Sequence, residues 1–323
     1  MTADVVQIAA PSWQRFGPRL VAEFPDFEWI VVDTDSVMLH TAAGTQAEIE
    51  PQQAQPTVAW MCFEVFGSPV MRRHFKMAET APTVELVHAS YAGLDGEYWQ
   101  RLADRGIEVT SAHLSGVPIA EFIMHRVLDW FQRGPVRHHS QAAHQWHRYE
   151  YREVFGTNWL VVGMGAIGTE VAVRARAFGA SVTGVRRSPA GDEPVDAMIG
   201  PDDLPDHVGK ADVVVFTLPS SPDTDDLVDA DLLARFKPDA VLVNVGRGSL
   251  IDEDALRQAL DAEQLEGAIL DVMRTEPLPS DHWMWDHPKV WVSPHNSAAG
   301  NNRFERSYGH FVKAMRARSA GRR

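Results

Sequence analysis

The sequence has a single cysteine and no hydrophobic run long enough to cross a membrane. Cys62 has no partner in the chain, which excludes an internal disulfide and any metal site built from several cysteines. No apolar run approaches the roughly 18 residues that a bilayer requires. Met1–Ala10 also lacks the basic and apolar segments of an export signal. We therefore expect a cytoplasmic protein that binds no membrane, with Cys62 as a buried structural thiol.

Positive charge is scarce as well. Lys and Arg number 30 against 44 Asp and Glu, a formal net charge of -14, so the phosphates of a nucleic acid would be repelled. The histidines from His138 to His147 have no accompanying carboxylate and no spacing that puts a ligand set on one helix face. We expect them to form a polar connecting arm and expect no metal site. Acidic ligands must therefore be bound by local arginines.

The chain is long enough for two domains, with 323 residues of which 45% are hydrophobic. Short apolar runs rich in β-branched residues alternate with helix-like stretches in two series, which indicates two parallel sheets of an α/β protein. The first series predicts strands at Val5–Ala9, Trp29–Val32, Val58–Phe63, Val84–His88 and Ile107–Thr110. The second predicts strands at Trp159–Val162, Ser181–Val185, Asp212–Leu218, Ala240–Val245, Ala268–Asp271 and Val290–Val292.

Two segments outside these strands have helical spacing of their apolar residues. Pro118–Phe131 lies between the two series, with a proline in its first turn and one apolar stripe. Phe304–Met315 follows the second series, and we expect it to pack back on the N-terminal unit. The N-terminal domain would then be discontinuous in sequence.

A glycine-rich turn follows the first strand of the second series. The residues Gly163-Met164-Gly165-Ala166-Ile167-Gly168 match G-x-G-x-x-G, and a helical stretch from Thr169 to Phe178 comes next. The first glycine permits the tight turn, the second lets a pyrophosphate approach the backbone, and the third lets the helix pack on the strand. Free N–H groups at the helix start would face the phosphates. We predict a nicotinamide-dinucleotide site at Gly163, Gly165, Ala166, Ile167 and Gly168.

The strand after this turn ends without an acidic residue. In NAD-binding domains an Asp or Glu about 20 residues after the turn binds the ribose 2′-hydroxyl. Here the strand Ser181–Val185 is followed by Arg186-Arg187-Ser188. Two guanidinium groups and a hydroxyl suit a 2′-phosphate, which a carboxylate would repel. We predict that NADP(H) is preferred and that NAD(H) is a second cofactor; in the alternative, these arginines are merely exposed.

An Arg, a Glu and a His each follow a predicted strand of the second sheet, where ligands bind in such folds. They lie in the segments Val243–Gly248, Leu270–Pro279 and Val292–Ser297. With these motifs and the glycine turn, the sequence resembles the D-isomer-specific 2-hydroxyacid dehydrogenase family from about Val84 to Gly300, and within it the NADP-type branch of glyoxylate/hydroxypyruvate reductases.

The resemblance implies roles for these three residues. Arg247 would bind the substrate carboxylate and carbonyl, His295 would be the general acid/base, and Glu276 would hold that histidine. The chemistry is coherent, because reduction of a 2-oxo acid needs a hydride at C2, a proton for the developing alkoxide and a cation for the oxygens. Glu276 beside His295 would favour the protonated imidazolium that donates the proton.

Further site residues are implied by the same resemblance. For the cofactor they are Leu218, Pro219, Val245, Gly246 and Asp271, in addition to the glycine turn and Arg186, Arg187 and Ser188. For the substrate they are Tyr91, Ala92, Gly93 and Trp285, of which the tryptophan could equally be a core residue. Phe63 and Phe66 suggest that the substrate side chain is apolar or aromatic.

The resemblance also implies the domain organisation. A dinucleotide-binding Rossmann domain, residues 113–296, would be inserted in a flavodoxin-like substrate domain made of residues 1–112 and 297–323. A homodimer would form through the Pro118–Phe131 helix and the arm after it. Two departures from the family pattern are Arg186-Arg187, where the family usually has Asp-Arg, and Ser297-Ala298 after the histidine.

The sequence thus predicts an NADP(H)-preferring 2-hydroxyacid dehydrogenase, an oxidoreductase acting on the CH-OH group, with a small 2-oxo or 2-hydroxy acid as its substrate. Three alternatives stay open. The chain could be an NAD-dependent phosphoglycerate-type dehydrogenase, or a dinucleotide-sensing regulator of the same fold. A formate dehydrogenase is disfavoured, since Glu276 stands where that branch has an uncharged amide.

Overall fold

The computed structural model describes residues 3–90, 94, 96–112 and 114–321. The loop residues Tyr91, Ala92 and Gly93, which we predict to bind substrate, lie outside this part of the chain. The polypeptide divides into two compact units, each built around its own sheet. Unit 1 consists of Met1–Leu114 and Asn301–Arg323, and unit 2 of Ser115–Gly300.

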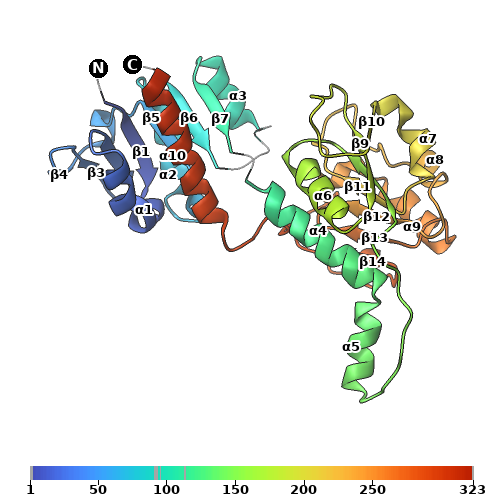
Figure 1. Cartoon of the computed structure of the whole chain (residues 1–323). Coiled ribbons are helices and arrows are strands. Elements are labelled where there is room, and N and C mark those ends of the chain that lie inside the picture. Colours follow the sequence, from blue (N-terminus) through green and yellow to red (C-terminus); the bar gives the residue numbers. More distant parts are fainter. Residues whose placement is uncertain (1–2, 91–93, 95, 113, 322–323) are drawn as a thin grey trace. The chain divides into compact units, whose positions relative to one another are not determined.

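Helices and strands alternate through both units (Figure 1). Unit 1 contains β1 Val5–Ala9, α1 Ala10–Glu23, β2 Glu28–Val32, β3 Val37–His40, β4 Gln46–Glu48, β5 Val58–Met61, α2 Met71–Thr80, β6 Leu86–Ala89, α3 Glu97–Asp104, β7 Glu108–Ser111 and α10 Arg303–Gly321. Unit 2 contains α4 Gly116–Phe131, α5 Gly134–Ala142, β8 Asn158–Val162, α6 Ala166–Ala177, β9 Ser181–Val185, β10 Ala197–Ile199, α7 Leu204–Val208, β11 Val213–Phe216, α8 Ala230–Leu233, β12 Val241–Asn244, α9 Glu253–Asp261, β13 Gly267–Leu270 and β14 Val290–Val292.

The sheet of unit 1 has the order β4-β3-β2-β1-β5-β6-β7. Its five predicted strands pair in parallel, in the order known from flavodoxin-like folds. Two strands that the apolar pattern did not predict, β3 and β4, extend the sheet antiparallel at the edge next to β2. All three residues of β4 are exposed, so no apolar run marks this strand in the sequence.

Alternating side chains of the unit 1 strands face opposite sides of the sheet. Val6, Ile8 and Trp60 lie in one cluster with Phe16 of α1 and Phe311 of α10. The opposite face carries a second cluster, which includes residues of β5, β6 and α3. Helix α10 therefore packs against strands that lie some 250 residues earlier in the chain (Figure 1). Cys62 is fully buried in the first cluster, as predicted, and this burial raises the pKa of its thiol.

A buried histidine makes unit 1 sensitive to acid. The His74 ring, which is fully buried, faces Gln7 Nε2 at 3.1 Å and the carbonyl oxygen of Trp60 at 3.1 Å. Burial lowers its pKa from 6.5 to about 4. The unfolded chain then takes up a proton on His74 at a higher pH than the folded one. The contribution of His74 to the unfolding free energy is therefore constant above about pH 6.5 and becomes destabilising as the pH drops toward 4.

We expect His74 alone to remove roughly 3 kcal/mol from the unfolding free energy of unit 1 over this pH range. His88, whose burial also lowers its pKa to about 4, adds to the fall. Urea unfolding followed between pH 7 and pH 4 measures the slope. In His74→Gln, which cannot bind the proton, the slope should be shallower between pH 6.5 and pH 4. An equal slope in native chain and variant would contradict the assignment.

The sheet of unit 2 is entirely parallel, with the order β10-β9-β8-β11-β12-β13-β14. The two faces again take alternate residues of each strand. Trp159 and Val161 of β8 pack toward α4 and α6, which lie side by side, whereas Leu160 and Val162 pack toward α7, α8 and α9. The strand order reverses between β8 and β11, the position where ligands bind in open parallel sheets. The two-sheet α/β fold predicted from the sequence is confirmed.

Beyond α4, the chain of unit 2 forms an arm. Helix α5 leaves the end of α4 and extends away from the sheet of its own unit (Figure 1). The segment then returns without regular structure to β8. Within the described ranges, no group of His, Cys, Asp and Glu side chains is arranged to hold a metal ion. None of the described helices combines the length and apolar character needed to span a membrane.

Candidate active site

The glycine turn lies at the carboxyl end of β8, where the strand order of the unit 2 sheet reverses. Gly163 has φ of 103°, a conformation that a side chain would strain, and a Cβ on Gly168 would come within 2.1 Å of the Gly163 carbonyl oxygen. Gly165, by contrast, is exposed, and a Cβ there would meet no atom within 4 Å. The open space lies directly before α6, whose first N–H groups have no partner within the helix. These residues fit a bound pyrophosphate.

Two neighbouring loops close on this turn. Thr217, after β11, donates a hydrogen bond from its Oγ1 to the Gly163 carbonyl oxygen at 2.6 Å. A Cβ on Gly246, after β12, would lie 2.5 Å from the carbonyl oxygen of Leu218. The structure therefore brings the segments of Leu218–Pro219 and Val245–Gly246 to the glycine turn. Their cofactor roles remain predictions.

Carboxylates lie against both arginines after β9. Arg186 donates from Nη1 to the carbonyl oxygen of Met164, inside the glycine turn, at 3.2 Å, and to Glu193 Oε1 at 3.0 Å. Arg187 contacts Asp223 at 3.3 Å, with both side chains mostly exposed. Ser188 is exposed. Arg186 is thus directed toward the dinucleotide turn, but it is paired with an acid that the sequence pattern did not single out.

A buried amide shapes the turn that carries Arg247. Asn244, the fully buried last residue of β12, accepts the N–H of Gly246 at 3.0 Å and donates from Nδ2 to the carbonyl oxygen of Arg247 at 2.9 Å. Gly248 has no room for a side chain, since a Cβ would lie 1.9 Å from the carbonyl carbon of Met273. Arg247 is half-buried, and its Nη1 donates to the Gly246 carbonyl oxygen at 2.8 Å. Asn244 therefore fixes the backbone from which the Arg247 side chain projects.

His295 and Glu276 form a direct pair. The Nδ1 of His295 lies 2.8 Å from Glu276 Oε2, although the two residues are 19 positions apart. Glu276 is itself held by the N–H of Met273, which donates to its Oε1 at 3.1 Å. The imidazole is 51% exposed, so its Nε2 side is open to a ligand while Nδ1 is engaged. This is the geometry that a positioned proton donor requires.

Asp271 holds the loop on which His295 lies. Its carboxylate, which is almost completely buried, accepts hydrogen bonds from Ser293 Oγ at 2.5 Å, from the N–H of Asn296 at 3.0 Å and from the N–H and hydroxyl of Ser297. His295 has a positive φ of 49°, and its N–H donates to the carbonyl oxygen of Asp271 at 2.9 Å. The loop conformation is therefore set by Asp271, whose predicted place near the nicotinamide remains a prediction.

An apolar cavity of about 430 Å³ adjoins the histidine. Its lining consists of His295 and Glu276 with five apolar or aromatic neighbours, namely Met273, Pro277, Leu278, Trp285 and Pro294. Trp285 is 49% exposed, and its Nε1 donates to the carbonyl oxygen of Pro279 at 2.9 Å. Of the two roles weighed for this tryptophan, the position fits the pocket wall and excludes the buried core.

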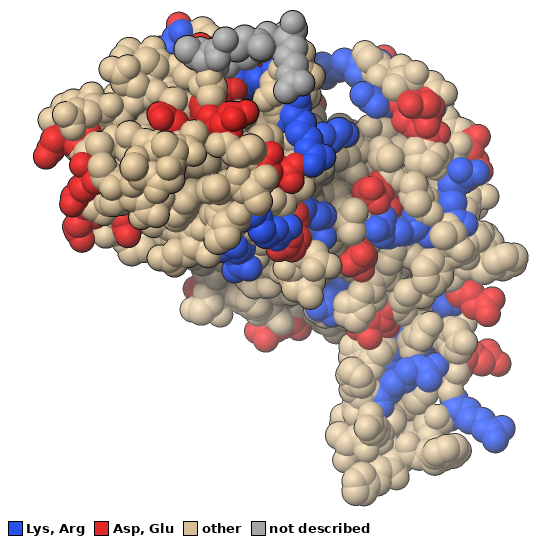
Figure 2. Space-filling model, turned by 60° about the vertical axis from the view of Figure 1, so that its left-hand side comes forward, with Lys and Arg blue, Asp and Glu red and all other residues tan. Residues whose placement is uncertain are grey.

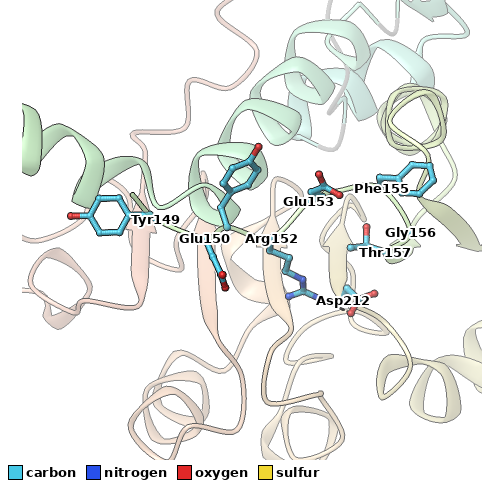
Figure 3. Close-up of a pocket in the computed structure, with 9 residues that line it drawn as sticks. Tyr149, Glu150, Arg152, Glu153, Phe155, Gly156, Thr157 and Asp212 are labelled. Atoms are coloured by element: carbon cyan, nitrogen blue, oxygen red, sulfur yellow. Dashed lines mark hydrogen bonds and ion pairs between the residues drawn. The ribbon is translucent and has the colours of Figure 1, made fainter. Parts of the chain in front are cut away.

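A second, wider hollow of about 740 Å³ lies where the arm returns to β8 (Figure 3). Arg152 is its cationic side chain, and Figure 3 shows it beside Asp212, with 2.5 Å between Nη2 and Oδ1. Lys237 contacts the same carboxylate. The Asp212 carboxylate also accepts the N–H of Asn158. Its contacts with Arg152, Lys237 and Asn158 therefore serve to hold this part of the structure together. None of the three predicted catalytic residues lines it.

Sequence reasoning missed four residues of this region: Thr217, Asn244, Ser293 and Glu193. A signal existed for Asn244, since an amide ends the otherwise apolar run Val241-Leu242-Val243. Thr217 likewise follows four apolar residues of β11. Nothing in the local pattern identified Glu193, which is seven positions away from the arginine it contacts.

The chain matches a known family over more than half of its length. The model of the family described as D-isomer specific 2-hydroxyacid dehydrogenase, NAD binding domain, covers residues 124–297. The D-3-phosphoglycerate dehydrogenase of Mycobacterium bovis is 33% identical over 246 residues, which are 75% of this chain and 46% of that protein. The glyoxylate/hydroxypyruvate reductase A of Serratia proteamaculans is 33% identical over 178 residues, 55% of this chain and 57% of that protein. The chain spans about half the length of these curated relatives.

A solved structure extends the similarity over both units. The D-isomer specific 2-hydroxyacid dehydrogenase from Xanthobacter autotrophicus Py2, determined in complex with NADPH and MES, is 25% identical to this chain. The comparison has a TM-score of 0.71 and covers 98% of this chain and 96% of the other. The similarity therefore includes unit 1, which lies outside the residues that the family model covers.

Proposed function

The chain belongs to the D-isomer specific 2-hydroxyacid dehydrogenase family, and from that membership we propose that it reduces a 2-oxo acid with NADPH in preference to NADH. The observation that carries the proposal is the His295–Glu276 pair on the wall of an apolar cavity, in the same unit as the glycine turn. A dinucleotide turn with a positioned proton donor is what hydride transfer to a carbonyl needs.

In the proposed reaction the reduced nicotinamide, when bound, supplies the hydride for C2. His295 donates the proton from Nε2 to the carbonyl oxygen, because its Nδ1 is occupied by Glu276. The Glu276 carboxylate stabilises the positive charge of the imidazolium before the proton leaves. Arg247 binds the substrate carboxylate and stabilises negative charge on the carbonyl oxygen. In the direction of oxidation, the neutral His295 takes the proton back.

The proposed cofactor preference depends on the loop after β9. Arg186 lies against the glycine turn, and Arg187 and Ser188 are exposed beside it. A guanidinium group there attracts a 2′-phosphate. The similar structure from Xanthobacter autotrophicus Py2 was determined with NADPH, which supports the same choice.

The cavity wall supports a substrate with an apolar side chain. Apart from His295 and Glu276, the described lining of this cavity is apolar or aromatic, which favours an apolar substrate side chain. Phe66 of unit 1, predicted near the substrate, is 44% exposed and contacts Phe75.

The test is NADPH oxidation with a panel of 2-oxo acids. The panel varies the size and the charge of the substrate side chain. It contains glyoxylate, pyruvate, hydroxypyruvate, longer aliphatic acids, phenylpyruvate and phosphohydroxypyruvate. We expect turnover that rises with apolar side-chain size. Highest kcat/KM with phosphohydroxypyruvate would instead favour a phosphoglycerate-type enzyme. No turnover with any acid would favour a dinucleotide sensor.

We also propose that the chain forms a homodimer through the α5 arm. Large apolar side chains are exposed along the arm and its return, with Trp146 at 93%, Phe155 at 74% and Tyr151 at 50%. Figure 2 shows the projecting arm as a mostly uncharged surface. Burying such aromatic side chains against a second copy would stabilise association.

Light scattering after gel filtration should give the mass of two chains for the native protein and of one chain for Trp146→Glu/Phe155→Glu, because each buried aromatic residue contributes about 2 kcal/mol or more. The control is Val173→Glu on α6, an apolar residue that is 47% exposed. A one-chain mass for the native protein, or a two-chain mass for the double variant, would contradict the proposal.

A further inference from the structure

The loop after β9 supplies a carboxylate that the sequence pattern lacks. The usual acid at the end of this strand is replaced by Arg186. Glu193, seven residues later, folds back so that its Oε1 lies 3.0 Å from Arg186 Nη1. The acid thus reaches the arginine that points at the glycine turn, even though it lies far from the expected position in sequence.

The Glu193 carboxylate is held from several sides. Its Oε1 accepts the N–H of Ala190 at 2.7 Å, and its Oε2 accepts the N–H of Gly191 at 2.8 Å. The side chain is only 6% exposed. The N–H of Ala190, with smaller contributions from Gly191 and Arg186, lowers the pKa of this carboxyl group. Glu193 is therefore a fixed negative charge at neutral pH.

This fixed charge changes what Arg186 offers to a ligand. The Nη1 of Arg186 is engaged by Glu193 and by the carbonyl oxygen of Met164, so the remaining donors of the guanidinium are directed by those two contacts. A dianionic 2′-phosphate bound to Arg186 would lie close to the Glu193 carboxylate and would be repelled by it. A ribose 2′-hydroxyl would meet no such repulsion, and it could donate a hydrogen bond to a carboxylate.

We propose that Glu193 is a specificity-determining residue that limits the preference for NADP(H) and keeps NAD(H) usable. The inference rests on the proposed function, because it assumes that the dinucleotide lies at the glycine turn with its adenosine ribose at the end of β9. Arg186 attracts the 2′-phosphate and Glu193 opposes it. The ratio of the affinity for NADP(H) to the affinity for NAD(H) is therefore set by Arg186 and Glu193 together, and not by the arginines alone.

The test is direct binding, measured by isothermal titration calorimetry with NADPH and NADH, and with 2′,5′-ADP and 5′-ADP as probes without nicotinamide. In Glu193→Gln we expect the affinity for NADPH and 2′,5′-ADP to rise about tenfold relative to that for NADH and 5′-ADP, or about 1.4 kcal/mol. The matched control is Asp192→Asn. It removes the same charge from the neighbouring exposed residue, while Arg186 keeps its contact with Glu193, and it should change the ratio less than twofold.

A double-mutant cycle separates the contact from general electrostatics. Arg186→Gln should lower the NADPH-to-NADH affinity ratio more in the Glu193→Gln background than in the native chain, because the arginine is then no longer opposed. If Glu193→Gln fails to fold, as judged by circular dichroism, the same affinity ratio is measured for Glu193→Asp instead. Its shortened side chain should raise the ratio about threefold.

An unchanged or lower ratio in Glu193→Gln, while both dinucleotides still bind, overturns the role of Glu193 and leaves the proposed function intact. It would mean that Glu193 orients Arg186 for the phosphate or only holds the loop. Absence of any dinucleotide binding by the native chain overturns the proposed function, and this inference with it.

Discussion

His295→Gln is expected to lower kcat for reduction of the best 2-oxo acid by about 10³-fold, because proton donation by a positioned side chain contributes roughly 10²–10⁴-fold to such reactions. The glutamine retains a similar size, so the cavity wall that His295 shares with Trp285 persists. Affinity for NADPH, measured by calorimetry, should stay within about twofold. His125→Gln, on the exposed side of α4, is the matched control and should have native activity.

The companion variant Glu276→Gln tests whether the carboxylate acts through the histidine. Glu276 Oε2 lies 2.8 Å from His295 Nδ1 and holds the ring in place. In the His295→Gln background, Glu276→Gln should therefore lower kcat little further, because the two residues act as one unit. A purely structural role for Glu276 would lower kcat by the same factor in both backgrounds.

Activity of His295→Gln within tenfold of the native rate would show that another group supplies the proton. A loss of NADPH affinity equal to the loss of rate would show a folding defect instead. The first result would contradict the proposed mechanism. Circular dichroism of the variant would identify the second, because a folding defect changes the spectrum.

Arg247→Gln is expected to lower kcat/KM for a 2-oxo acid by about 10³-fold. Removal of one donor to a developing oxyanion costs roughly 10²–10³ in rate, and the substrate carboxylate loses its cation as well. Arg247→Lys should recover only part of the loss, since an ammonium group cannot present the planar pair of donors that a carboxylate accepts. Steady-state kinetics with one acid and saturating NADPH gives both values.

The matched control is Arg235→Gln, which changes an exposed arginine that lies 3.9 Å from Asp206 and should have native kinetics. Full activity of Arg247→Lys would contradict bidentate binding by the guanidinium. Native kcat/KM in Arg247→Gln would remove this residue from the site.

The glycine turn illustrates what local sequence can predict. Three glycines between an apolar strand and a helix predict a tight turn, an open backbone and a close helix–strand contact. The structure has a positive φ at Gly163, open space at Gly165 and no room for a Cβ at Gly168. The strands were predictable for the same reason, since a buried parallel strand is a short apolar run. Three strands, β3, β4 and β10, were not predicted, and for β4 the reason is that an exposed edge strand needs no apolar residues. The family was predictable because its motifs are short and follow in order along the chain.

The contacts that each side chain makes could not be predicted from the local sequence. The pairing of His295 with Glu276 was predicted only by resemblance. Their 2.8 Å contact depends on a loop that the buried Asp271 carboxylate holds through hydrogen bonds from three residues, Ser293, Asn296 and Ser297. Trp285 could not be assigned to core or pocket from its neighbours in sequence, and its 49% exposure decided the question. Asn244 positions Arg247 through a hydrogen bond to its backbone carbonyl oxygen, and a contact of this kind cannot be predicted from a pattern of residue types.

The sequence by itself determined the α/β class, the dinucleotide turn and the family, because each follows from residues that are contiguous or recur at fixed spacing. The tertiary structure alone decided which charges meet. In the sequence, Arg186 and Arg187 are two cations with no acidic residue beside them. The fold pairs Arg186 with Glu193, and it pairs Arg187 with Asp223, which is 36 positions away. Electrostatic interactions depend on distance in space, and loop closure sets that distance independently of separation along the chain.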